Sequence, residues 1–84
     1  MKLPRDLSGA ALAKSLQILG YTITRQTGSH VRLTTCEKGE HHVTVPNHQS
    51  LKIGTLAAIL TDVAGHFLLS RNDLIAKLFG NKKY

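Results

Sequence analysis

Three short segments between Tyr21 and Pro46 restrict the fold more than any other part of this sequence, because polar and apolar side chains alternate along them. The segments are Tyr21–Gln26, Val31–Thr35 and His41–Val45. Alternation with a period of two is typical of β-strands that bury only one face. The apolar positions fall on the same side of all three segments, which predicts an antiparallel meander covered on one face.

The connections between these segments have the composition of turns. Gly28 and Ser29 suit a tight hairpin turn, which places His30 on the first residue of the second strand. Residues 37–40, with a glycine and charged neighbours, supply the second turn. The predicted outward face is polar and carries His30, Arg32, His42, Thr22, Thr24, Thr34 and Thr44.

Helical sequences flank the strands on both sides. Ser8 is a suitable N-cap for a helix over Ala10–Leu19, and Gly20 suits the C′ position that ends it. A second helix is predicted over Lys52–Ala64, with Gly65 as its stop. Its inward positions are predicted to be Ile53, Leu56, Ile59, Leu60 and Val63.

Some residues around the second helix carry separate expectations. Gly54 in the first turn costs about 1 kcal/mol relative to alanine, so we expect the close approach of another group to require it. His66 is expected just past the helix end. A third helix is predicted over about residues 70–79, begun by a capping box of Ser70 and Asp73. The last residues, Asn81–Tyr84, are expected to fray.

The predicted order of elements is α-β-β-β-α with an extra C-terminal helix. Helices packed on one face of a three-stranded antiparallel sheet make an α+β two-layer sandwich. Double-stranded-RNA-binding domains use the same order, which is an analogy of fold. The 84 residues suffice for a single domain, which we expect over residues 1–84 with its core at about 7–67.

The charge balance indicates the class of partner. Eleven Lys and Arg oppose five Asp and Glu, which gives a net charge of +6. Such an excess favours polyanions, with nucleic acid first and acidic proteins second, although a solubilising surface has the same composition. The apolar stretches are too short to span a membrane, and Met1–Gly9 lacks a signal-peptide segment, so we expect a cytoplasmic protein.

Cysteine and histidine usage argues against a metal or redox site. Cys36 is the only cysteine, so an internal disulfide is excluded, and the neighbouring Glu37 does not favour a thiolate. His41 and His42 are adjacent on a strand and point to opposite faces, so they do not easily share one zinc ion with His48. We expect no metal and no cofactor.

Five stretches of the sequence carry a resemblance to a known family. They are Leu7-Ser8-Gly9, Leu19-Gly20-Tyr21, the hexapeptide at 25–30 that ends in Gly-Ser-His, the hexapeptide at 43–48, and the decapeptide at 51–60. In this order and spacing, over about Leu7 to Phe67, the chain resembles the HicA toxins, small mRNA interferases of bacterial toxin–antitoxin pairs. Two departures are Val31, where a second histidine often follows, and a longer C-terminal helix, which bears on the antitoxin surface.

The resemblance implies a double-stranded-RNA-binding-like fold, cleavage of mRNA without a metal, and neutralisation by a cognate HicB-like antitoxin. The family's catalytic histidine, in Gly-Ser-His, falls on His30. Two rival functions remain open at this point. One is a non-catalytic RNA-binding module of the same fold, and the other is a basic protein-interaction domain.

The chemistry of metal-free RNA cleavage is compatible with these residues. It needs a base for the ribose 2′-OH, an acid for the departing 5′ oxygen and positive charge near the phosphate. A histidine, with an ordinary pKa near 6.5, suits either proton task, and His30 is the candidate. The candidate RNA- or phosphate-binding residues are Gly28, Ser29, Arg32, Lys52, Gly54 and Thr55. Each also has a plain structural interpretation as a turn residue, an exposed strand charge or an ordinary helix start.

Overall fold

The three alternating segments form one antiparallel sheet in the order β1-β2-β3, in a computed structural model that describes residues 3–80. The strands are β1 (Thr22–Thr27), β2 (His30–Thr35) and β3 (His41–Pro46). The helices are α1 (Gly9–Leu16) with the 3₁₀ turn η1 (Gln17–Leu19), α2 (Ile53–Phe67), and α3 (Arg71–Ile75) with the π-helical segment η2 (Ala76–Gly80). The predicted order of elements is confirmed.

Local signals account for both ends of the first helix. The Ser8 hydroxyl accepts a hydrogen bond from the amide of Ala11 at 3.0 Å, as an N-cap does. Gly20 ends the helical stretch with φ of 86°, in the left-handed region that glycine adopts without strain. Gly9 lies directly against the end of β3, because a Cβ on Gly9 would overlap the carbonyl oxygen of Pro46.

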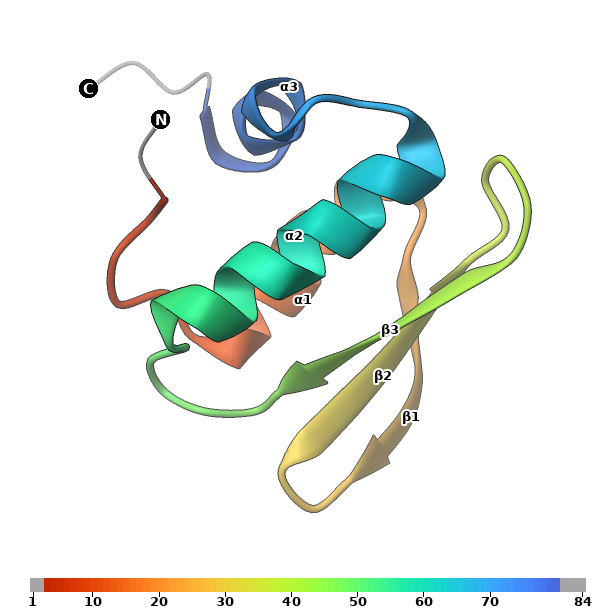
Figure 1. The fold of residues 1–84 in the computed structure, drawn as a ribbon. Coiled ribbons are helices and arrows are strands. Elements are labelled where there is room, and N and C mark those ends of the chain that lie inside the picture. The colour runs from red at the N-terminus through yellow and green to blue at the C-terminus, as the bar shows by residue number, and fades with distance from the viewer. Residues whose placement is uncertain (1–2, 81–84) are drawn as a thin grey trace.

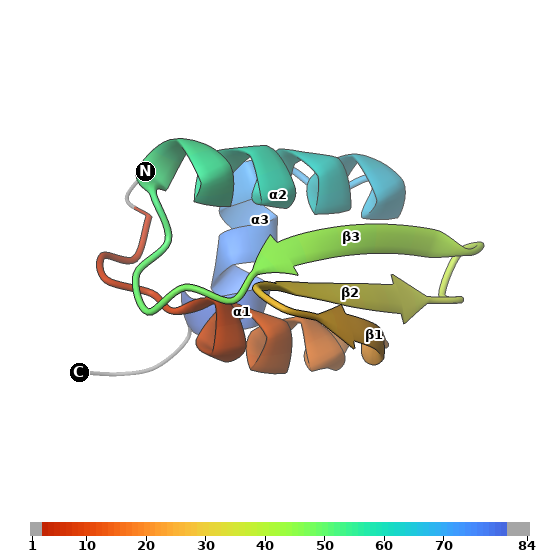
Figure 2. The same cartoon turned by 90° about the horizontal axis from the view of Figure 1, so that it is seen from below.

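The helices cover one face of the sheet and leave the other face open (Figures 1 and 2). Helices α1 and α2 run along the same side of the strands, and α3 with η2 lies across them on the side away from the sheet. The core between the layers contains side chains with no exposed surface: Leu12, Leu16, Tyr21, Leu33, Val45, Leu60, Val63 and Leu74. The chain is therefore an α+β two-layer sandwich of the α-β-β-β-α type with an additional C-terminal helix, as predicted.

A bulge in β1 breaks the alternation that the sequence predicts. Ile23 lies opposite Leu33, but the next paired residue of β1 is Arg25, opposite Arg32. Thr24 is the extra residue, and its hydroxyl hydrogen-bonds that of Thr34 at 2.9 Å on the outward face. Because one inserted residue shifts the two-residue period by one step, Arg25 joins the outward face.

Helix α2 differs from its predicted form in three respects. It passes through Gly65 and ends at Leu68, which takes the left-handed C-cap conformation with φ of 58°, so the predicted stop is wrong. Burial of Phe67 in the core stabilises the extra turn, and glycine permits a helix end without imposing one. Ile53 was predicted to point inward, but its side chain is 53 % exposed at the first residue of the helix. Among residues 3–80, no group beyond the neighbouring helical backbone lies within 4 Å of a Cβ on Gly54, so no close approach in the described part of the chain requires the glycine.

The third helix follows its sequence signals. The hydroxyl of Ser70 accepts a hydrogen bond from the amide of Asp73 at 3.0 Å, and Leu74 and Leu78 are buried. Asn81–Tyr84, which were expected to fray, lie outside the described residues. Within residues 3–80, no single helix is long and apolar enough to cross a membrane. One pair, α2 with the C-terminal helical segment, meets the length and composition criteria together but is bent by 103°.

Candidate nucleic-acid interface

The turn between β1 and β2 has the predicted two-residue form. Thr27 and His30 are paired across the hairpin, and Gly28 occupies the first central position with φ of 49°. The carbonyl oxygen of Ser29 accepts a hydrogen bond of 2.6 Å from the amide of Asn47, which follows β3. The turn is thus fixed to the neighbouring strand, and His30 begins β2 as the sequence predicts.

His30 lies on the open face of the sheet. Its side chain is exposed, and its neighbours along β2, Val31 and Leu33, are buried on the other face. The Ser29 hydroxyl lies 3.4 Å from Nδ1 of the imidazole, which is a weak contact. Within residues 3–80, His30 forms no ion pair. The Nε2 side of the ring is thus accessible to a ligand from solvent.

Two arginines follow His30 along the same face. Arg32 is exposed two residues further along β2, and Arg25 is exposed directly opposite it on β1. In the described part of the chain, no carboxylate pairs with either guanidinium. Arg32 was among the predicted candidates, whereas Arg25 was missed because the bulge that turns it outward has no clear signal in the sequence.

The remaining candidates lie apart from this face. Lys52 is the N-cap of α2 and forms no side-chain capping bond, Gly54 is exposed, and Thr55 is half-buried. Helix α2 lies on the covered side of the sheet and is joined to the end of β3 by residues 47–52 (Figure 2). The structure therefore groups Gly28, Ser29, His30 and Arg32 and does not bring Lys52, Gly54 and Thr55 to the open face.

A chain of polar contacts crosses the open face beyond the arginines. The hydroxyl of Thr34 lies 2.7 Å from Nδ1 of His42, and Nε2 of His42 lies 3.0 Å from a carboxylate oxygen of Glu40. Thr24 joins this chain through its contact with Thr34. Glu40 is therefore engaged with His42.

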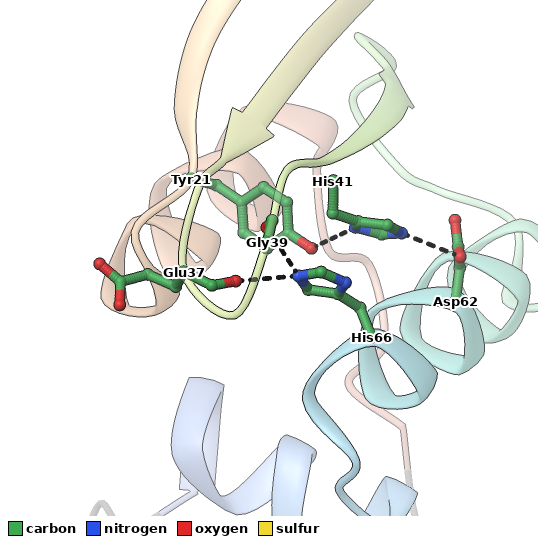
Figure 3. A network of polar contacts seen from close by, with 6 residues as sticks. All are labelled: Tyr21, Glu37, Gly39, His41, Asp62 and His66. Atoms are coloured by element: carbon green, nitrogen blue, oxygen red, sulfur yellow. Dashed lines mark hydrogen bonds and ion pairs between the residues drawn. The ribbon is translucent and has the colours of Figure 1, made fainter.

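A second histidine cluster lies at the end of the sheet away from His30, on the helix side (Figure 3). Nε2 of His41 lies 3.2 Å from Oδ1 of Asp62 on α2, and Nδ1 lies 2.7 Å from the hydroxyl of Tyr21. Since a carboxylate only accepts, Nε2 of His41 is the donor to Asp62, and in the tautomer with its hydrogen on Nε2 the Nδ1 atom accepts the Tyr21 hydroxyl hydrogen. Tyr21 has no exposed surface, so its hydroxyl depends on this bond.

His66 completes this cluster and fixes the turn between β2 and β3. Its Nε2 donates to the carbonyl oxygens of Glu37 at 2.9 Å and Gly39 at 3.1 Å, and its ring stacks on His41 with centroids 4.4 Å apart (Figure 3). The expectation that His66 lies past the helix end is wrong, because α2 extends to Phe67. The cluster is a structural support, since it joins the β2–β3 turn and β3 to α2 on the helix side of the sheet and not on the open face.

His41 and His42 point to opposite faces of the sheet, as the alternation along the strand predicts. His41 faces the helices and His42 faces outward, with the respective contacts to Asp62 and Glu40. Among residues 3–80 no group of three or more His, Cys, Asp or Glu side chains is arranged to hold a metal ion.

Cys36 is an exposed free thiol. The carbonyl oxygen of His48 accepts a hydrogen bond of 2.9 Å from the amide of Gly9.

The ionisation of Tyr21 is expected to make stability depend on alkaline pH. Burial first, and then the charge of Asp62, raise the pKa of Tyr21 from 10.0 to about 12. The protonated phenol therefore stabilises the fold fully below about pH 10, and this contribution is lost as the pH rises to about 12. The loss is expected to be about 2–3 kcal/mol.

Urea unfolding of the wild type and of Tyr21→Phe across this pH range measures the effect. Tyr21→Phe is expected to lack this part of the alkaline decline, whereas Tyr84→Phe, which removes the only other tyrosine, is expected to keep it. An equal decline in the wild type and Tyr21→Phe contradicts the assignment.

These features define a class of protein: a small basic α+β domain whose open sheet face carries imidazole and guanidinium groups. A family model described as the HicA toxin of bacterial toxin–antitoxin systems matches residues 9–64, two-thirds of the chain. The chain belongs to the HicA toxin family, and membership implies an antitoxin partner. No curated protein and no solved structure matches it.

Proposed function

We propose that this protein is a metal-independent endoribonuclease that cleaves mRNA as the toxin of a toxin–antitoxin pair. The observation that carries the proposal is the placement of His30 on the open face of the sheet, beside a fixed turn and two arginines that have no ion-pair partner in the described part of the chain. Membership of the HicA toxin family supports the same function. The net charge of +6 favours attraction of a polyanion.

The proposed reaction is a transfer of the phosphate to the neighbouring ribose oxygen. The 2′-OH loses its proton and attacks the adjacent phosphorus, the bond to the 5′ oxygen breaks, and that oxygen gains a proton. His30 takes part in one of these proton transfers through its exposed ring. The amides of Gly28 and Ser29 hold the oxygens of the cleaved phosphate, since negative charge accumulates on them in the transition state, and the guanidinium of Arg32 neutralises the phosphate backbone beside it.

Lys52, Gly54 and Thr55 have a different place in this proposal. The first amides of α2 point out of the N-terminal end of the helix, where the N-cap Lys52 supplies no side-chain acceptor, and the positive end of the helix favours an anion. Because α2 lies on the covered side of the sheet, these residues are proposed to contact RNA at a distance from the cleaved bond. The proposed partners are mRNA and a HicB-like antitoxin in the cytoplasm.

The direct test is incubation of a labelled single-stranded RNA with the purified protein in excess chelator. We expect fragments to form, and we expect a single 2′-deoxy substitution at the cleaved position to block cleavage there, because the attacking oxygen is missing. Intact RNA in this assay overturns the proposal. Tight binding of that intact RNA supports the non-catalytic RNA-binding module, whereas weak RNA binding even at low salt supports the protein-interaction domain.

A further inference from the structure

We propose that Arg25 and Arg32 form a paired site for one phosphodiester of single-stranded RNA, the one next to the bond cleaved at His30. This inference deepens the proposed function and rests on it. The bulge at Thr24 produces the pair, because in a regular ladder Thr24 would pair with Arg32, and Arg25 would point to the covered side with Ile23. The next residue of β1, Gln26, faces Val31 on the covered side.

The geometry of the sheet fixes how far the site lies from His30. Arg25 and Arg32 are directly opposite each other, so their Cα atoms are about 4.5–5.5 Å apart and their side chains rise from the same face. His30 lies two residues earlier on β2, about 7 Å along the strand. An extended RNA strand on this face therefore brings consecutive phosphates to His30 and to the arginine pair.

The arginine pair destabilises the folded protein when no ligand is bound, which argues that an external anion binds between the two side chains. Like charges directly opposite each other on a sheet repel, and in the described part of the chain no acidic side chain compensates either arginine. Glu40, the acidic residue on this face, is engaged with His42. A phosphodiester removes the repulsion, and the planar guanidinium groups match its oxygens in a bidentate geometry.

Other groups on the face suit a single-stranded ligand. Outward threonines, such as Thr27 beside His30 and Thr44 opposite Arg32, offer hydroxyl groups that can hydrogen-bond to the RNA backbone whatever the base sequence. Contacts to the phosphate backbone of a nucleic acid dominate the binding affinity, and the charged ones make that affinity depend on salt concentration. We therefore expect the arginine pair to account for a measurable part of the salt dependence of RNA affinity.

The test uses His30→Ala protein as the background, so that RNA is bound without being cut. Binding of a labelled single-stranded RNA is measured against salt concentration for this protein and for versions that also carry Arg25→Ala, Arg32→Ala or both. Arg71→Ala is the matched control, because it removes one arginine from α3, on the side of the helices away from the sheet. Urea unfolding of each variant is measured in parallel.

The double variant is expected to bind about tenfold more weakly at low salt, with the slope of log affinity against log salt reduced by about 0.7 for one lost phosphate contact. Arg71→Ala is expected to keep the slope. The unfolding midpoint of Arg25→Ala is expected to equal or exceed that of its parent, because the repulsion is removed. An unchanged slope in the double variant overturns the inference.

Cleavage assays separate this inference from the proposed function. If wild-type protein cleaves RNA and the double arginine variant retains full affinity and slope, the paired site is wrong and the nuclease proposal stands. If wild-type protein leaves RNA intact while affinity depends on both arginines, the phosphate site stands without the reaction.

Discussion

Replacing His30 with alanine is expected to lower the rate of RNA cleavage at least about 100-fold and to leave the fold unchanged. A positioned general acid or base contributes about 10²–10⁴-fold to such a reaction. The side chain is exposed, and within residues 3–80 its one polar contact is the weak one to the Ser29 hydroxyl, so its removal exposes no core surface. Surface substitutions of this kind usually change stability by less than about 0.5 kcal/mol.

Single-turnover cleavage of a labelled RNA, together with urea unfolding, measures both parts of this prediction. His42→Ala is the matched control, because His42 is also an exposed strand histidine on the same face but lies beside Glu40 and Thr34, away from the turn. We expect it to retain cleavage within about tenfold, the loss of one binding contact. Undiminished cleavage by pure, folded His30→Ala protein removes His30 from the reaction.

Replacing Gly9 with alanine is expected to lower the free energy of unfolding by about 2–4 kcal/mol. An added Cβ overlaps the carbonyl oxygen of Pro46, and both atoms belong to rigid backbone at the start of α1 and the end of β3. The overlap is relieved only if α1 and β3 move apart. This movement weakens the hydrogen bond from the Gly9 amide to the carbonyl oxygen of His48. Overpacking costs about 1–3 kcal/mol, and the disturbed hydrogen bond adds about 1 kcal/mol.

The matched control for this prediction is Gly54→Ala, which places the same methyl group in the first turn of α2. In the part of the chain that the structure describes, no atom beyond the neighbouring helical backbone lies within 4 Å of this methyl group, so we expect a gain of about 0.5–1 kcal/mol from the better helix former. Urea unfolding at neutral pH measures both variants. Equal stability of Gly9→Ala and the wild type contradicts the close packing of α1 on β3.

The layout of this fold was predictable because local signals and the hydrophobic pattern agree. Ser8 and Gly20 cap the first helix as expected, and Val31, Leu33, Val43 and Val45 bury one face of the sheet. The turn that presents His30 follows from its two small residues. Each of these features depends on chain segments of a few residues or on a simple period, which a sequence displays directly.

The features that escaped prediction depend on contacts between distant segments. Helix α2 continues past Gly65 because Phe67 is buried in the core and His66 bonds to the carbonyl oxygens of residues 37 and 39. Arg25 reaches the open face because β1 carries one residue more than its partner strand, and Thr24 has no property that marks it as the extra one. A pattern of side chains does not reveal such register shifts.

The bulge also affects how this molecule behaves among its own copies. Strand β1 is an outer strand of the sheet, and its free backbone groups are a template on which another extended chain can assemble. The irregular step at Thr24 and the charge of Arg25 interrupt that template near its middle. One surplus residue thereby makes this edge of the sheet a poorer template for pairing with a second copy.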